Sequence, residues 1–133
     1  MKINPEKYKT VLVIDDEDVD LFLAKKVLGK MKSIENVILY SNGKQAFSFI
    51  KNIKKKEEVP ELILLDLKMP GFSGEDFLNQ FQELPEYISS HTKVVVVSAY
   101  LGFHEGEHIN SKMFPCIHKL LQKPLKQDEL EMV

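Results

Sequence analysis

Five residues that could take part in metal or phosphoryl chemistry lie within two residues of the ends of apolar segments of this sequence. They supply three carboxylates, one hydroxyl and one ammonium: Asp15, Asp16, Asp66, Ser98 and Lys123. Crowded carboxylates repel one another, and a divalent cation such as Mg²⁺ relieves the repulsion while sharing its ligand shell with phosphate oxygens. Beside a metal, a hydroxyl and an ammonium, one carboxylate can attack a phosphoryl group. We expect Asp66 to be that nucleophile.

The elements that must position these residues alternate between strands and helices. Continuous apolar runs predict five strands, buried on both faces, at Thr10–Ile14, Asn36–Tyr40, Glu61–Asp66, Lys93–Val97 and Cys116–Leu121. Helical spacing of apolar residues predicts helices at Val19–Met31, at Ala46–Ile53, after a Ser73 cap, weakly at His104–Met113, and from Gln127. This alternation is typical of an α/β fold in which helices cover both faces of a parallel sheet. Because ligands bind at the carboxyl ends of such strands, the five residues should share one rim.

Composition narrows the class of protein. The 133 residues, 44% of them apolar, fit one domain spanning 1–133, with residues 1–8 as an N-terminal extension. A net charge of −2 provides no broad basic field for nucleic acid, and all 18 cationic residues are lysines, so a phosphate would meet an ammonium. One cysteine, Cys116, excludes an internal disulfide, and no apolar run is typical of a membrane span or signal peptide. We therefore expect a cytoplasmic protein.

The sequence resembles the CheY-like receiver domain of two-component response regulators. The motifs that carry the resemblance run from about Thr10 to the C-terminus: Asp15-Asp16, Leu65-Asp66-Leu67-Lys68-Met69-Pro70-Gly71 with Gly74, Ser98-Ala99, and Lys123-Pro124. The resemblance implies a flavodoxin-like, doubly wound sheet of five parallel strands in the order 2-1-3-4-5. It also implies a signalling switch in place of an ordinary enzyme.

The resemblance assigns roles to the acidic residues. Asp66 matches the aspartate that accepts a phosphoryl group from a histidine kinase or a histidine phosphotransfer protein. Asp16, Asp66 and the backbone carbonyl of Lys68 match the ligands of Mg²⁺ (or Mn²⁺), and Asp15 matches a neighbour that acts through water.

The remaining positions match the residues that bind the phosphoryl group and respond to it. Ser98, next to Ala99, matches the hydroxyl that turns toward that group, and Lys123 matches the lysine that pairs with one of its oxygens. The implied switch rearranges the fourth helix, the fifth strand and the last helix, and this face would bind a protein partner. The chain itself would be a monomer or a weak dimer through the same face.

Three positions depart from the family's usual pattern. Lys68 stands where the family often carries asparagine, and its ammonium could slow autodephosphorylation. Leu120 stands where many members carry a tyrosine or phenylalanine that rotates on activation. Tyr100 could modify access to the site, and packing at the surface explains it equally well.

Two alternatives stay open from the sequence. The first is an interaction module that has this fold without phosphorylation. The second is a zinc hydrolase, because His104-Glu105-Gly106-Glu107-His108 matches the H-E-x-x-H signature. Against zinc, Gly106 weakens a helix by about 1 kcal/mol relative to alanine, and no strong third ligand accompanies the two histidines. The sequence does not decide between a single-domain regulator and a fragment of a longer one.

Overall fold

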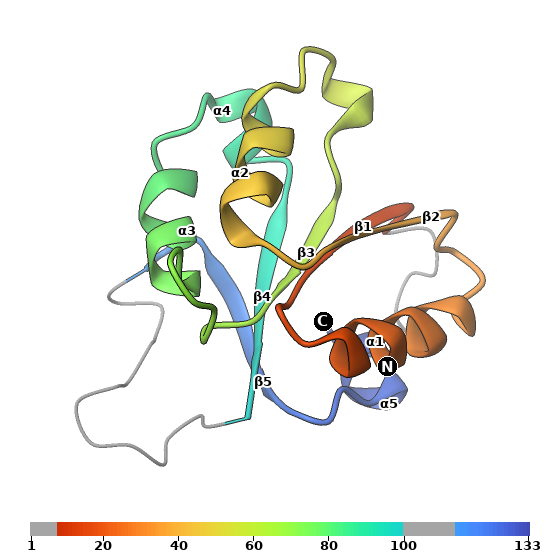
Figure 1. Ribbon diagram of the computed structural model, residues 1–133. Helices are drawn as coiled ribbons and strands as arrows, with labels where there is room; N and C mark the ends of the chain where they lie inside the picture. The colour runs from red at the N-terminus through yellow and green to blue at the C-terminus, as the bar shows by residue number, and fades with distance from the viewer. Residues whose placement is uncertain (1–7, 100–113) are drawn as a thin grey trace.

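The computed structural model describes residues 8–99 and 114–133, and a parallel five-stranded sheet forms its centre (Figure 1). The strands are β1 (Thr10–Ile14), β2 (Asn36–Tyr40), β3 (Leu62–Leu65), β4 (Lys93–Ser98) and β5 (Ile117–Gln122). Their order is β2-β1-β3-β4-β5, and every neighbouring pair is parallel. The predicted flavodoxin-like fold is therefore confirmed.

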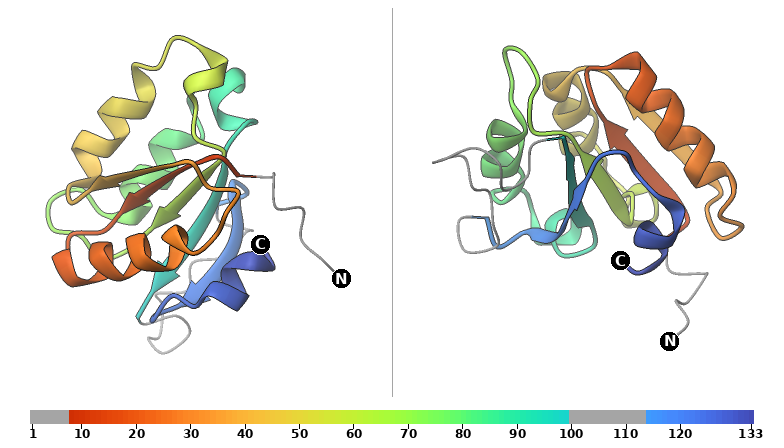
Figure 2. Two further views of the ribbon diagram at one scale, coloured as in Figure 1. Left: turned by 90° about the vertical axis from the view of Figure 1, so that its right-hand side faces the viewer. Right: turned by 90° about the horizontal axis from the view of Figure 1, so that it is seen from below.

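Helices cover both faces of this sheet, and the two views of Figure 2 show the sheet between their layers. The helices are α1 (Asp18–Gly29), α2 (Gly43–Lys51), α3 (Gly74–Phe81), α4 (Glu86–Ser89) and α5 (Gln127–Glu131), with a 3₁₀ turn at Lys56–Glu58. α1 and α5 pack on one face, and α2, α3 and α4 pack on the other (Figures 1 and 2). None of the helices in the described ranges has the length and apolar character needed to cross a bilayer.

Each face of the sheet has its own hydrophobic core, and the central strands contribute side chains to both cores. Successive side chains of a strand point to opposite faces. Leu12 and Ile14 of β1 therefore join the core under α2 and α3, whereas Val11 and Val13 join the core under α1. The second core also contains Tyr8, whose hydroxyl donates a hydrogen bond to the carbonyl of Val133 at 3.2 Å.

Local sequence signals set most of the helix boundaries. Ser73 caps α3 as predicted, and it forms a reciprocal capping box with Asp76. α2 begins at Gly43, three residues before the predicted start at Ala46, because the side chain of Asn42 caps it by accepting a hydrogen bond from the amide of Gln45.

The predicted and observed elements also differ at β3 and at α4. β3 ends at Leu65, so Asp66 lies just beyond the strand and not within it. The four-residue α4 was not predicted, since a helix this short shows no apolar period. The helix predicted at 104–113 lies outside the described residues.

Candidate functional site

The sheet brings the predicted acidic residues together at the carboxyl ends of β1 and β3. Hydrogen bonds continue the strand ladders one residue past each strand. The amide of Asp66 donates to the carbonyl of Ile14 at 2.9 Å, and the amide of Asp15 donates to the carbonyl of Tyr40 at 3.1 Å. Because both backbones are held by the sheet, the two carboxylates have fixed positions, and both residues are buried.

Three carboxylates form a compact acidic cluster at this rim. One oxygen each from Asp15, Asp16 and Asp66 lies within 4.8 Å of the other two. Oδ1 of Asp16 is buried and accepts no hydrogen bond within the described part of the chain. A buried carboxylate oxygen without a donor is unfavourable unless a cation or water satisfies it. The cluster therefore fits a hard divalent cation with oxygen ligands.

The ammonium of Lys123 lies among the carboxylates and reaches one that the sequence did not predict. Nζ lies 2.7 Å from Oδ2 of Asp15, 2.8 Å from Oδ2 of Asp20 and 3.3 Å from Oδ1 of Asp66. The backbone amide of Lys123 donates to the carbonyl of Ser98 at 2.9 Å, which extends the pairing of β4 with β5 and fixes the lysine at the rim. Asp20 comes from the first turn of α1.

The charges at the rim shift its protonation equilibria. Burial and the nearby charge of Asp15 raise the pKa of Asp66 to about 6, although the Lys123 ammonium acts in the opposite direction. Burial also raises the pKa of Asp15, against the hydrogen bond from Lys123. Despite its burial, Lys123 has a raised pKa because Asp15, Asp20 and Asp66 stabilise the ammonium. In the metal-free protein, the rim thus carries more negative charge than one ammonium neutralises.

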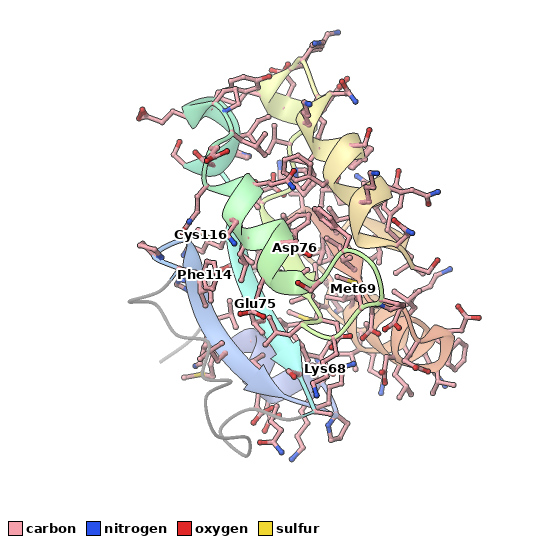
Figure 3. All side chains as sticks on the ribbon, turned by 60° about the vertical axis from the view of Figure 1, so that its left-hand side comes forward. Lys68, Met69, Glu75, Asp76, Phe114 and Cys116 are labelled. Atoms are coloured by element: carbon pink, nitrogen blue, oxygen red, sulfur yellow. The ribbon has the colours of Figure 1, made fainter. Side chains whose placement is uncertain are left out.

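The loop between β3 and α3 closes one side of the site, and Figure 3 shows Lys68 and Met69 on it. Met69 is buried against the core, whereas the side chain of Lys68 is exposed. Gly71 has φ = +81°, a left-handed conformation that a side chain disfavours. The two ends of the loop are joined where the amide of Gly74, the first residue of α3, donates to the carbonyl of Leu67 at 2.9 Å.

An open depression lies above Asp66. The residues that line it come from α1 and from the ends of β1, β3, β4 and β5: Asp16, Glu17, Asp20, Asp66, Lys68, Ser98, Ala99, Lys123 and Pro124. Ser98 is buried at the end of β4, and Ala99 next to it is exposed. The depression is accessible from solvent, and Asp66 lies in its lining.

Three further features of the sequence were predicted to bear on the site: Leu120, Tyr100 and the zinc signature. Leu120 lies on β5, where it is half-buried and packs against the core under α2 and α3. Tyr100 and the zinc signature at 104–108 lie outside the described residues. Asp20 was missed, because an acidic residue in the first turn of a helix is ordinarily explained by the helix dipole.

A parallel sheet with this strand order and an acidic cluster at its rim defines a receiver domain. A family model described as the response regulator receiver domain matches residues 11–133. The chain therefore belongs to this family, which serves two-component signalling.

Curated relatives include both small regulators and parts of large proteins. The chain is 26% identical over 102 residues to response regulator Rcp1 of Synechocystis sp., and the match covers 69% of each protein. It is 25% identical over 123 residues to the osmosensing histidine protein kinase SLN1 of Saccharomyces cerevisiae. That match covers 92% of this chain but 10% of SLN1, so the chain spans about a tenth of that relative's length.

Solved structures show the same fold. A response regulator receiver protein from Dyadobacter fermentans superposes with a TM-score of 0.79 at 26% identity, covering 93% of each chain. The Mn²⁺-bound form of response regulator Rcp1 superposes with a TM-score of 0.68 at 27% identity, covering 93% of this chain and 87% of that one.

Proposed function

We propose that this chain is a phosphoacceptor switch in which Asp66 receives a phosphoryl group from a histidine kinase or a histidine phosphotransfer protein. The observation that carries the proposal is the buried acidic cluster with Lys123 beside it. Asp66 lies at its centre, 3.3 Å from the ammonium and open to the depression above. Kinases and regulators among the relatives support the class of donor.

The transfer itself requires little covalent chemistry from the protein. An oxygen of the Asp66 carboxylate attacks phosphorus, a P–O bond forms, and the bond to the donor nitrogen breaks with its electrons leaving on the donor imidazole. The transferred group carries charge on three equatorial oxygens, so catalysis consists mainly of positioning and charge neutralisation.

Each residue at the rim has a place in this reaction. Asp16, Asp66 and the backbone carbonyl of Lys68 would bind Mg²⁺ or Mn²⁺ directly, and Asp15 would bind it through water. The cation would neutralise charge on the phosphoryl oxygens. The described structure supports this assignment through the buried, unsatisfied Oδ1 of Asp16, and the Mn²⁺-bound form of Rcp1 supports the class of metal.

The opposite side of the phosphoryl group would be bound by Ser98 and Lys123. Ser98 is buried at the end of β4 and lines the depression together with Asp66 and Lys123. The phosphoryl group carries about 1.5 to 2 negative charges and three acceptor oxygens, and it replaces the single charge of the Asp66 carboxylate. Movement of Ser98 and Lys123 toward these oxygens would then change the segment 99–125, and a partner protein would bind the changed face.

Intact mass spectrometry of the purified protein tests the proposal. The chain is incubated with acetyl phosphate and Mg²⁺, and Asp66→Asn is treated in parallel. A phosphoryl adduct on the wild type alone, abolished when a chelator replaces Mg²⁺, is the expected result. No adduct on either protein would overturn the proposal and favour an interaction module that is never phosphorylated.

A further inference from the structure

The Lys123 ammonium has three carboxylate partners, and one of them lies outside the acidic cluster. An ammonium has three N–H donors, and here each has one carboxylate oxygen within reach, from Asp15, Asp20 and Asp66. The separation from Asp20, 2.8 Å, is shorter than the 3.3 Å from Asp66. Asp20 comes from a helix, and the other two come from strand ends.

This ion pair differs from an ordinary pair at the surface. Exposed pairs contribute little because water screens them and both side chains move freely. Lys123 has only 16% of its side chain exposed, and Asp20 has 32%. A lysine side chain has a flexible four-carbon stem, so its ammonium has a defined position only where several acceptors hold it. Asp20 supplies the acceptor on the α1 side.

Among the described residues, Asp20 is also the one carboxylate partner of Lys123 that does not belong to the group of possible metal ligands. The cluster of possible metal ligands contains Asp15 and Asp66 but not Asp20. A cation bound directly by Asp16 and Asp66, and by Asp15 through water, would interact with two of the three carboxylates that lie beside the Lys123 ammonium. The carboxylate of Asp20 would remain hydrogen-bonded to the ammonium.

We propose that Asp20 is a positioning residue that holds the Lys123 ammonium beside Asp66, so that it meets an oxygen of the incoming phosphoryl group. The inference rests on the proposed function for its effect on phosphorylation, but the contact between the two side chains can be tested without it. In this role Asp20 acts through the Lys123 ammonium, to which its carboxylate is hydrogen-bonded.

Two substitutions separate the hydrogen bond from the charge. Asp20→Ala removes both the acceptor and the charge. Asp20→Asn removes the charge and retains an amide oxygen that can accept from Nζ. Asp18→Ala is the matched control, because Asp18 is an exposed acidic residue in the same first turn of α1. Circular dichroism and the thermal midpoint of each variant verify the fold.

The first readout is the ¹⁵N NMR signal of the Lys123 ammonium, assigned with Lys123→Ala and recorded without phosphoryl donor. Hydrogen bonds to several carboxylates slow the exchange of its protons with water, so we expect a visible signal in the wild type and in Asp18→Ala. Asp20→Ala should broaden or lose it, and Asp20→Asn should retain it at least in part. An unchanged signal in Asp20→Ala would overturn the inference.

The second readout is the rate of phosphorylation by acetyl phosphate at saturating Mg²⁺, with Mg²⁺ affinity measured separately by calorimetry. A misplaced catalytic group commonly reduces a rate about tenfold or more. We expect that reduction in Asp20→Ala, partial recovery in Asp20→Asn, and little change in Mg²⁺ affinity. A wild-type rate in Asp20→Ala would contradict the inference. If the wild type itself takes up no phosphoryl group, the proposed function fails, and the ammonium signal still decides whether Asp20 positions Lys123.

Discussion

The backbone carbonyl oxygen of Asp66 lies only 2.6 Å from the point that a Cβ atom on Gly74 would occupy. The Cα atom of Leu67 would lie at 2.7 Å from the same point. Both contacts are with backbone, which cannot move aside as the end of a flexible side chain can. The absence of a side chain at position 74 therefore lets α3 begin directly against the residue that we propose to be phosphorylated.

We expect Gly74→Ala to destabilise the protein and to disturb the site together. Overpacking of a tight contact typically costs about 1 to 3 kcal/mol. Chemical unfolding measures this loss, and calorimetry with Mg²⁺ measures the effect on the acidic cluster. Gly29→Ala is the control, because a Cβ atom there would meet nothing within 4 Å. Equal stability of the wild type and Gly74→Ala would show that the backbone at Asp66 can shift freely.

The raised pKa of Asp66 predicts an unusual pH dependence of stability in the presence of a chelator. The folded protein keeps this proton up to about pH 6, whereas the unfolded chain releases it near pH 4. The folded state thus binds more protons in this range, so the free energy of unfolding falls as the pH rises from about 4 to about 6. The contribution of Asp66 is at most about 3 kcal/mol.

Asp66→Asn should remove this contribution. We expect the variant to be more stable than the wild type at pH 8 without metal, and to lose less stability between pH 4 and pH 6. Urea unfolding at a series of pH values gives both results. Parallel curves for the two proteins would mean that the Asp66 carboxylate is not strained by its burial and by Asp15.

Binding of Mg²⁺ should stabilise the wild type through the same carboxylates. At a concentration about 100 times the dissociation constant, a ligand specific for the folded state adds about 2.7 kcal/mol. Asp16→Asn should lose most of this gain, because it alters the residue whose buried Oδ1 has no donor in the described structure. Glu86→Gln, an exposed change on α4, serves as the control. Full stabilisation of Asp16→Asn by Mg²⁺ would exclude Asp16 as a ligand.

Lys68 should lengthen the lifetime of the phosphoryl group. Its exposed side chain lines the depression above Asp66, where a positive charge can screen the phosphoryl group and hinder an attacking water. Lys68→Asn should therefore shorten the lifetime severalfold, measured as loss of the adduct after removal of acetyl phosphate. Lys54→Asn makes the same charge change at an exposed position outside the depression. Equal lifetimes in the wild type and Lys68→Asn would refute this role.

The strand ends could be predicted because buried parallel strands are continuous apolar runs, so the polar residue after each run marks the rim. That rule led to Asp15, Asp66 and Ser98, and Lys123 follows the end of the last predicted strand by two residues. The structure brings all four to one edge. Asp20 could not be found by the same rule, since an acidic residue in the first turn of a helix ordinarily complements the helix dipole. Its role depends on the distance to Lys123, a residue 103 positions away.

Chemical trapping determines whether Asp66 itself accepts the phosphoryl group. Protein treated with acetyl phosphate and Mg²⁺ is reduced with borohydride, which converts an acyl phosphate to an alcohol, and is then digested after lysine for peptide sequencing by mass spectrometry. Asp66 lies in the peptide that runs from Glu57 to Lys68. We expect homoserine at position 66 of this peptide, and only when acetyl phosphate and Mg²⁺ were both present before the reduction. Intact aspartate at position 66, or homoserine at another position such as Asp15 or Asp16, would contradict this expectation.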